Sequence, residues 1–313
     1  MIEKTSYILS KFPNKDPNSR GQIHTTCPFH DDNTSSFSIN VEEGVFICGS
    51  SHCGIRGAFP LFYKLMENID SWVEVFEDLK SKDPNYDLNE FFSADKGPRV
   101  SSIIINPFPE PPGIEPLGDI QFLQDRGITP EVCQRYGLVY GREGRHSGIS
   151  IRSSIVAPVW DVDSVYKTFQ VRYLSPNSPT RWLNPVGSPI QELLYGGHAI
   201  DPYAEFLWVV EGASDVWRMS TFGVQSVGLN TKEASPSQFN KIKSVCDTFK
   251  CQPVICLDGD AAVAPSAYEM SCNDILYINL AAFGFQPKIV TLNYSEDPGS
   301  LSYDRFLELQ ETL

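Results

Sequence analysis

The pattern of apolar and polar residues divides the chain into segments of different character. Ser36–Ile47 alternates as a β-hairpin does, and Ala58–Leu79 has the apolar spacing of helix. Residues 81–116 are rich in proline and only weakly patterned, which predicts a semi-extended linker. Residues 117–313 contain regular apolar runs and therefore predict the larger folded body.

Within the larger body, strands and helices are expected to alternate toward the C-terminus. Helices are expected at Gly118–Arg126 and Pro130–Tyr136, and strands at Ile155–Trp160 and Val165–Tyr173. The next expected elements are strands at Phe206–Val210, Val224–Leu229, Pro253–Leu257 and Lys288–Leu292, and helices at Ser214–Phe222, Pro236–Val245 (with Ser235 as N-cap) and most of Ala261–Phe283. This alternation predicts an α/β fold with a mainly parallel sheet over 201–313, preceded by a mixed α+β part.

The composition is that of a folded protein with a core. Of the 313 residues, 41% are hydrophobic and 20% are charged, and the length predicts two or three domains. No apolar stretch reaches the ~18 residues of a membrane-spanning helix. The segment Met1–Phe12 has charged residues and no apolar run, so no signal peptide is expected. We therefore expect a cytoplasmic protein, in which cysteine clusters more often bind metal than form disulfides.

The net charge of −14 argues against a nucleic-acid binder, but the charge is unevenly distributed. Residues 135–185 carry seven lysines and arginines against three acidic residues, a balance of +4. Residues 186–313 carry seven against sixteen, a balance of −9. The middle of the chain thus suits a phosphate backbone and the last third suits cations, with ordinary solvated faces as the alternative interpretation.

Four residues near the N-terminus have the spacing of a zinc site. Cys27 and His30 form a C-x₂-H pair, and Cys48 and Cys53 form a C-x₄-C pair that begins after seventeen intervening residues. Two close pairs on two turns supply the four nitrogen and sulfur ligands of a tetrahedral zinc ion. Because four protein ligands leave no open position, the site is assigned to folding and recognition.

The fourth zinc ligand has an alternative, and the hairpin between the pairs supplies packing. His52 competes with Cys53 because both are close to Cys48. Phe37 and Phe46, on the expected hairpin, would pack under the metal.

Four acidic residues in the last third are placed where buried strands are expected to end. Glu211 follows one such strand, Asp215 lies in the first turn of the next helix, and Asp258 and Asp260 follow a second strand. The carboxyl ends of strands in an α/β sheet border the crevice where ligands bind, so these carboxylates should converge. Crowded carboxylates need cations, and hard oxygen ligands select Mg²⁺ or Mn²⁺, which predicts phosphoryl transfer. Asp297 is expected to add a carboxylate to the same edge.

Several sequence segments resemble known families. Cys27-Pro-Phe-His30-Asp-Asp-Asn-Thr-Ser-Ser-Phe37-Ser resembles the CHC2 zinc ribbon of bacterial and phage DNA primases. Glu211-Gly-Ala-Ser-Asp215-Val216, Asp258-Gly-Asp260 and Glu296-Asp297-Pro298 resemble the Toprim domain, which DnaG-type primases share with type IA and II topoisomerases and some nucleases. Phe122–Glu131, Arg181-Trp-Leu-Asn184-Pro185 and Leu194-Tyr195-Gly196 resemble the remainder of the primase polymerase core.

This resemblance implies a domain order. It covers about residues 24–60 and 118–305, in the order that the family has. It implies a zinc-binding domain at 1–80, a linker at 81–116, a basic subdomain at 117–200 and a Toprim-type catalytic subdomain at 201–313.

The resemblance also implies roles for the acidic residues. Glu211 would act as general base on the attacking 3′-hydroxyl group. Asp258 and Asp260 would hold Mg²⁺, with Asp215 and Asp297 assisting.

Four residues of the middle segment are implied to contact nucleic acid. Arg172, Arg181 and Asn184 would contact the template or the incoming nucleotide, and Arg152 is a further candidate.

The function implied is that of a DNA primase of phage origin. Such an enzyme makes short RNA primers on single-stranded DNA from ribonucleoside triphosphates, with structural Zn²⁺ and catalytic Mg²⁺ or Mn²⁺. The chain contains no P-loop sequence, so the replicative helicase is expected in a separate chain, unless this sequence is a fragment of a primase-helicase.

Two alternatives to a primase stay open. One is a Toprim nuclease that uses the same acids. The other is a catalytically weak, primase-derived DNA-binding or regulatory protein, which is favoured by the absence of basic residues at Gln191-Glu192 and in Ala261–Pro265.

Overall fold

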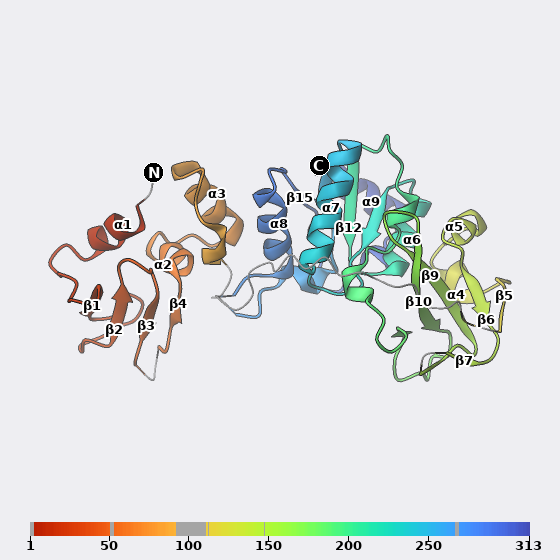
Figure 1. Ribbon diagram of the computed structural model, residues 1–313, viewed down its shortest axis with the longest axis horizontal. Coiled ribbons are helices and arrows are strands. Elements are labelled where there is room, and N and C mark those ends of the chain that lie inside the picture. The colour runs from red at the N-terminus through yellow and green to blue at the C-terminus, as the bar shows by residue number, and fades with distance from the viewer. Residues whose placement is uncertain (1–2, 51–52, 92–110, 112, 147, 267–268) are drawn as a thin grey trace. The chain divides into compact units, whose positions relative to one another are not determined.

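The computed structural model describes residues 3–50, 53–91, 111, 113–146, 148–266 and 269–313. The chain forms two compact units, Met1–Arg99 and Val100–Leu313. Both units are drawn in Figure 1, with the N-terminal unit in red to orange.

The first unit is built on a four-stranded antiparallel sheet with strand order β1-β2-β3-β4. Its elements are α1 (Lys4–Lys11), β1 (Gln22–Thr25), β2 (Phe37–Asn40), β3 (Phe46–Cys48), β4 (Arg56–Gly57), α2 (Phe59–Met66), α3 (Trp72–Lys82) and the 3₁₀ helix η1 (Leu88–Phe91). The pairing of β2 with β3 confirms the predicted hairpin. The single helical segment predicted at Ala58–Leu79 is instead two helices, because Asn68 has a positive φ and Ser71 caps α3.

The second unit begins with a five-stranded antiparallel sheet of order β11-β10-β9-β6-β5. Its elements are β5 (Ile114–Pro116), α4 (Gln121–Asp125), α5 (Pro130–Arg135), β6 (Val139–Gly141), β9 (Ser154–Trp160), β10 (Tyr166–Tyr173) and β11 (Trp182–Leu183), with a separate hairpin of β7 (Arg145–His146) and β8 (Ile149–Ser150). The predicted helical pair and two longer strands are confirmed. The 3₁₀ helix η1 and strand β5 fall inside the range expected as linker, whose residues 92–110 and 112 lie outside the described part of the chain.

A four-stranded parallel sheet of order β13-β12-β14-β15 forms the rest of the second unit. Its elements are η2 (Ile190–Glu192), η3 (Gly197–Ala199), β12 (Phe206–Val210), α6 (Ala213–Thr221), β13 (Ser226–Gly228), α7 (Pro236–Phe249), β14 (Gln252–Ile255), η4 (Gly259–Ala262), α8 (Cys272–Ala282), β15 (Lys288–Ile289), η5 (Pro298–Ser300) and α9 (Tyr303–Gln310). The predicted parallel sheet is confirmed. The expectation of helix over most of Ala261–Phe283 is wrong for its first half, because α8 starts only at Cys272, where Ser271 and Asp274 form a capping box.

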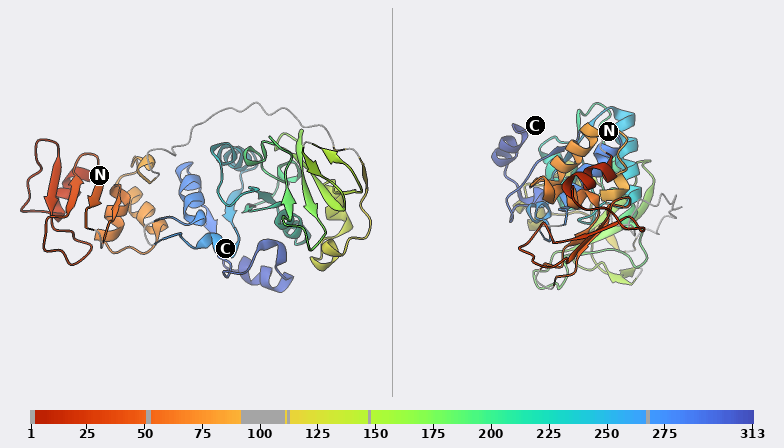
Figure 2. Two further views of the ribbon diagram at one scale, coloured as in Figure 1. Left: turned by 90° about the horizontal axis from the view of Figure 1, so that it is seen from below. Right: turned by 90° about the vertical axis from the view of Figure 1, so that its left-hand side faces the viewer.

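Helices cover both faces of the parallel sheet, as Figure 1 shows around β12. On one face Trp208 packs in a core with Trp217 of α6 and Phe306 of α9. That core continues to the antiparallel sheet, whose strands are green in Figure 2 and lie beside the parallel sheet. On the other face Val209 packs with residues of α7 and α8. Burial on both faces leaves the carboxyl edge of the parallel strands as the open side, and this edge positions the site.

The described residues include no helix that combines the length and the apolar character needed to cross a bilayer.

Candidate functional site

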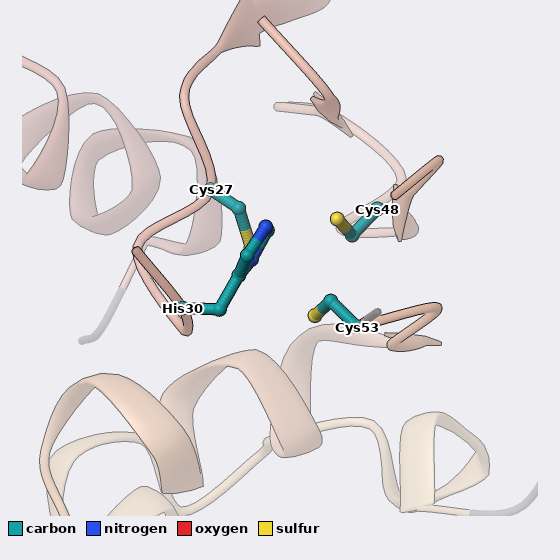
Figure 3. A group of neighbouring side chains, drawn as sticks. All are labelled: Cys27, His30, Cys48 and Cys53. Carbon is teal, nitrogen blue, oxygen red and sulfur yellow. The ribbon is translucent and has the colours of Figure 1, made fainter. Parts of the chain in front are cut away.

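The four predicted zinc ligands come together in the first unit. One ligand atom from each of Cys27, His30, Cys48 and Cys53 lies within 4.8 Å of all the others. Figure 3 shows their side chains directed toward a common point from two turns. Nδ1 of His30 is buried and has no hydrogen-bond partner among the described residues, an arrangement that is costly unless a metal takes that nitrogen. The donor set therefore fits Zn²⁺, while His52 lies outside the described residues.

Aromatic packing and one carboxylate support these ligands. Phe37 and Phe46 are fully buried, with ring centroids 5.6 Å apart. Asp32 was not predicted to matter, yet it accepts hydrogen bonds from the Cys27 amide at 2.8 Å and from Ser36 Oγ at 2.5 Å. These hydrogen bonds hold the pKa of Asp32 below its usual range, and the bond from Ser36 has the largest effect.

The contact of Ser36 extends the network around Asp32 to a second zinc ligand. Its Oγ lies 3.3 Å from Sγ of Cys48, so the carboxylate of Asp32 is linked to one ligand of each pair. Such outer hydrogen bonds orient metal ligands. The sequence pattern could not identify Asp32 among the neighbouring polar residues, because its role depends on how the loop folds back.

The predicted acidic cluster forms at the carboxyl edge of the parallel sheet. Strands β12 and β14 are direct neighbours, as the prediction required. Glu211 follows β12 at once, Asp258 comes three residues after the end of β14, and Asp260 lies in η4. Carboxylate oxygens of these three residues lie within 4.8 Å of one another.

Asp215 and Asp297 lie beside this group of three rather than within it. Asp215 is buried, and its Oδ2 accepts a hydrogen bond of 2.7 Å from the amide of Gly212, so it caps its own helix. Asp297 precedes η5, whose Gly299 comes so close that an added Cβ would be 2.5 Å from Oδ1 of Asp215. Asp215 and Asp297 both line the same cleft as Glu211.

Burial and neighbouring carboxylates raise the pKa values of Glu211, Asp258 and Asp215. Burial, followed by the charge of Asp258, raises the pKa of Glu211 to about 7. Burial, followed by the charge of Asp297, raises the pKa of Asp258 to about 6, and burial and Asp258 also raise that of Asp215. Such a group binds protons unless a cation neutralises it.

Two carboxylate oxygens of the cluster are available to a cation. Oδ1 of Asp258 and Oδ1 of Asp260 are buried and have no hydrogen-bond partner among the described residues. Converging, unpaired carboxylate oxygens are ligands that Mg²⁺ and Mn²⁺ prefer, so the residues present fit such an ion.

Arginines line the other side of the same cleft. The cleft has a volume of about 550 Å³, and Arg126, Arg172 and Arg181 contribute to its lining together with the acids. The guanidinium carbon of Arg172 lies 4.5 Å from the centroid of the Phe122 ring. Burial, followed by the charges of Arg126 and Arg181, lowers the pKa of Arg172 to about 10.

These three arginines have no carboxylate partner in the described part of the chain. Their charge is therefore available to a phosphate group in the cleft, since arginine binds phosphate oxygens strongly. Asn184 lines the cleft as well, with its Oδ1 accepting a hydrogen bond of 3.1 Å from Gln170.

One predicted contact residue is not part of this arrangement, and two unpredicted ones are. Arg152 is exposed and does not line the cleft. Arg126 and Lys232 line it, although neither was singled out from the sequence. Arg126 lies within Phe122–Glu131, which resembles the primase core, and Lys232 follows the strand predicted at Val224–Leu229, so position along the chain could have suggested both.

Known proteins are similar to this chain over most of its length. Residues 18–90 match the family model of the CHC2 zinc finger. A DNA primase of Legionella pneumophila is 24% identical over 337 residues, which cover 93% of this chain and 56% of that protein. The DNA primase of Escherichia coli strain K12 is 23% identical over 334 residues, covering 89% of this chain and 54% of that protein. The chain is thus similar to DNA primases over most of its length, and its residues 18–90 match the zinc finger model. It spans about half the length of these curated relatives.

Solved structures of primases are similar as well. The Aquifex aeolicus primase (zinc-binding and RNA polymerase domains) is 20% identical with a TM-score of 0.47, covering 99% of this chain and 83% of that one. A DnaG primase catalytic domain bound to single-stranded DNA is 20% identical with a TM-score of 0.48, covering 61% of this chain and 70% of that one.

Proposed function

We propose that this chain carries the zinc-binding and RNA-synthesising parts of a DNA primase. The observation that carries the proposal is one cleft with carboxylates on one wall and, on the other, arginines that form no ion pair with a described carboxylate, in a chain that also has a CHC2 zinc finger. Adjacent walls of opposite charge suit a reaction that brings a metal-bound triphosphate to a nucleic-acid strand. The second unit is then a Toprim-type catalytic core.

The reaction is nucleotidyl transfer. The 3′-oxygen of one ribonucleotide attacks the α-phosphorus of the next triphosphate, the bond to the β-phosphate oxygen breaks, and pyrophosphate leaves. The hydroxyl proton passes to a carboxylate of Glu211, whose raised pKa suits a general base near neutral pH. Arg172 and Arg181 would neutralise phosphate charge on the opposite wall.

A divalent ion would be held by Asp258 and Asp260, with Asp215 and Asp297 close by. Bound there, Mg²⁺ or Mn²⁺ would supply charge neutralisation for the phosphates and polarise the reacting oxygen.

The partners of the proposed enzyme follow from the same interpretation. The template is single-stranded DNA, the substrates are ribonucleoside triphosphates, and a replicative helicase in a separate chain would deliver the template. A helicase contact would raise the local DNA concentration, which offsets the repulsion expected from a net charge of −14. We further propose a phage origin and a bacterial cytoplasm as the setting.

Primer synthesis on single-stranded DNA tests the proposal. The protein is incubated with labelled ribonucleoside triphosphates, Mg²⁺ and templates of varied sequence, with and without a helicase, and oligoribonucleotides are resolved by gel. The double variant Asp258→Ala/Asp260→Ala should lose at least ~10³-fold in rate, because the metal ligands are removed. If the native protein makes no oligoribonucleotide under any condition, the primase proposal fails, and cleavage of the DNA would favour the nuclease.

A further inference from the structure

Lys232 lies in the cleft and contacts the acidic cluster. It belongs to the loop between β13 and α7, and its Nζ forms an ion pair with Oδ2 of Asp260. Its side chain is 52% exposed, so the ammonium group is not locked in a packed environment. A lysine stem with four methylene groups can therefore move its charge between neighbouring partners in this cleft.

Lys232 stands apart from the arginines in the cleft lining. Arg126 and Arg172 come from the segment of the antiparallel sheet and its helices, whereas Lys232 comes from the carboxyl edge of the parallel sheet. Among the described residues that line the cleft, it is the one cation supplied by the parallel-sheet part. No basic residue occurs in Ala261–Pro265, directly after the Asp260 to which it is paired.

The two carboxylate oxygens of Asp260 differ in their contacts. Its Oδ2 is taken by Lys232, while its Oδ1 is buried with no hydrogen-bond partner among the described residues. A divalent ion at Oδ1 and the ammonium group at Oδ2 would lie close together and repel each other. Binding of a metal ion to Asp260 thus weakens the hold of Asp260 on Lys232.

We propose that Lys232 binds the β- and γ-phosphates of the incoming nucleoside triphosphate, and that it leaves Asp260 when the metal-bound triphosphate enters. This inference rests on the function proposed above. The triphosphate brings about four negative charges into the cleft. Apart from Lys232, the charged residues that line the cleft from the parallel-sheet part are carboxylates. The ammonium group of Lys232, once released from Asp260, provides a positive charge on that wall. Without it, the metal ion alone would have to neutralise the phosphates from that side.

The inference predicts effects of opposite sign on two ligands. In Lys232→Ala, Mn²⁺ alone should bind roughly tenfold more tightly, because a neighbouring positive charge is removed from Asp260. ATP in saturating Mn²⁺ should bind roughly tenfold more weakly, because a charge-assisted contact to phosphate is lost. Lys232→Arg should restore ATP binding to within about threefold of the native protein, since it keeps the charge.

Binding measurements on the full chain carry the test. Titration calorimetry gives the dissociation constants of Mn²⁺ and of Mn²⁺-ATP for the native protein, Lys232→Ala and Lys232→Arg. The matched control is Lys243→Ala, which removes another half-exposed lysine paired with a single carboxylate, Asp247, on helix α7. The control should change neither constant. Partial unfolding of Lys232→Ala would weaken the binding of both Mn²⁺ and Mn²⁺-ATP. This result is distinguishable from the predicted changes, which have opposite signs.

Binding of single-stranded DNA is measured as a second test, because the DNA backbone also presents phosphates to which Lys232 could bind. If Lys232→Ala weakens binding of an oligodeoxynucleotide tenfold and leaves Mn²⁺-ATP unchanged, the lysine serves the template and the inference is wrong. Unchanged binding of both Mn²⁺ and Mn²⁺-ATP would also overturn it. The outcome is separate from that of primer synthesis, because the binding constants are measurable even if the native protein makes no primers.

Discussion

Single hydrogen bonds around Asp32 are expected to decide how tightly the zinc site holds its ion. Asp32 accepts bonds from the Cys27 amide and from Ser36, and Ser36 in turn contacts Sγ of Cys48. In Asp32→Ala both ligand pairs lose this support, so zinc affinity should fall by about 10- to 100-fold. Competition with a chromogenic chelator measures the change.

The neighbouring Asp31 provides a control with the same change of charge. Asp31 is exposed, whereas Asp32 is partly buried. Asp31→Ala should therefore leave zinc affinity within about twofold, as surface charges contribute little. Equal losses in the two variants would show that charge, and not the hydrogen bonds of Asp32, supports the site.

At the residue scale, prediction succeeded where a side chain's position follows from the local pattern. Glu211 and Asp258 follow buried apolar runs, and the ends of such runs meet at one edge of a parallel sheet. Lys232 could not be assigned in this way, because its contact partner, Asp260, is 28 residues away along the chain. Arg152 shows the converse, since a basic residue in a basic segment proved to lie outside the cleft.

At the scale of elements, long buried runs were predictable and short or interrupted ones were not. Strand β12 is apolar throughout and was predicted with its observed bounds, Phe206–Val210. The edge strands β5 and β11 have only three and two residues, too few for a periodic pattern. The break between α2 and α3 depends on the backbone at Asn68, which apolar spacing does not report.

The convergence of two strand ends makes the stability of the second unit depend on pH. The pKa of Glu211 is raised to about 7 and that of Asp258 to about 6, above their ordinary values of 4.5 and 3.8. Between pH 4 and pH 7 the unfolded chain releases protons that the folded chain keeps, so metal-free protein should lose stability as pH rises. Its melting temperature should fall by roughly 2–4 °C for each kcal/mol lost, measured by calorimetry in chelator.

Two experiments, addition of Mg²⁺ and the Asp258→Asn variant, separate the effect of this cluster from other causes of pH dependence. Mg²⁺ added at pH 7.5 should raise the melting temperature again, because it binds only the folded cluster. Asp258→Asn removes one of the charges that raise the pKa of Glu211. The melting temperature of this variant should therefore fall less between pH 4 and pH 7 than that of the native protein. A decline as steep as that of the native protein would contradict the assignment of the pH dependence to this cluster.

At the scale of the whole molecule, the two units have separate cores and separate groups of candidate metal ligands. The first unit buries aromatic residues such as Phe37 and Phe46 beside the zinc ligands, whereas the acidic cluster belongs to the second unit alone. The division into two units was expected from the weakly patterned stretch between them. Its boundary was not, because η1 and β5 use residues from that stretch in folded structure.

Separate cores predict two unfolding transitions that respond to different metals. A zinc chelator with low affinity for Mg²⁺ should lower the transition of the first unit by 10 °C or more, on the order of what losing a structural zinc costs a small domain. It should leave the second transition in place. Addition of Mg²⁺ should raise only the second, and Cys48→Ser should imitate the chelator without changing the Mg²⁺ response. Scanning calorimetry measures both transitions, and the intrinsic fluorescence of a Trp72→Phe variant follows the second one alone, because the other four tryptophans lie in the second unit. A single transition that shifts with both metals would mean that the two units unfold together, and would contradict this prediction.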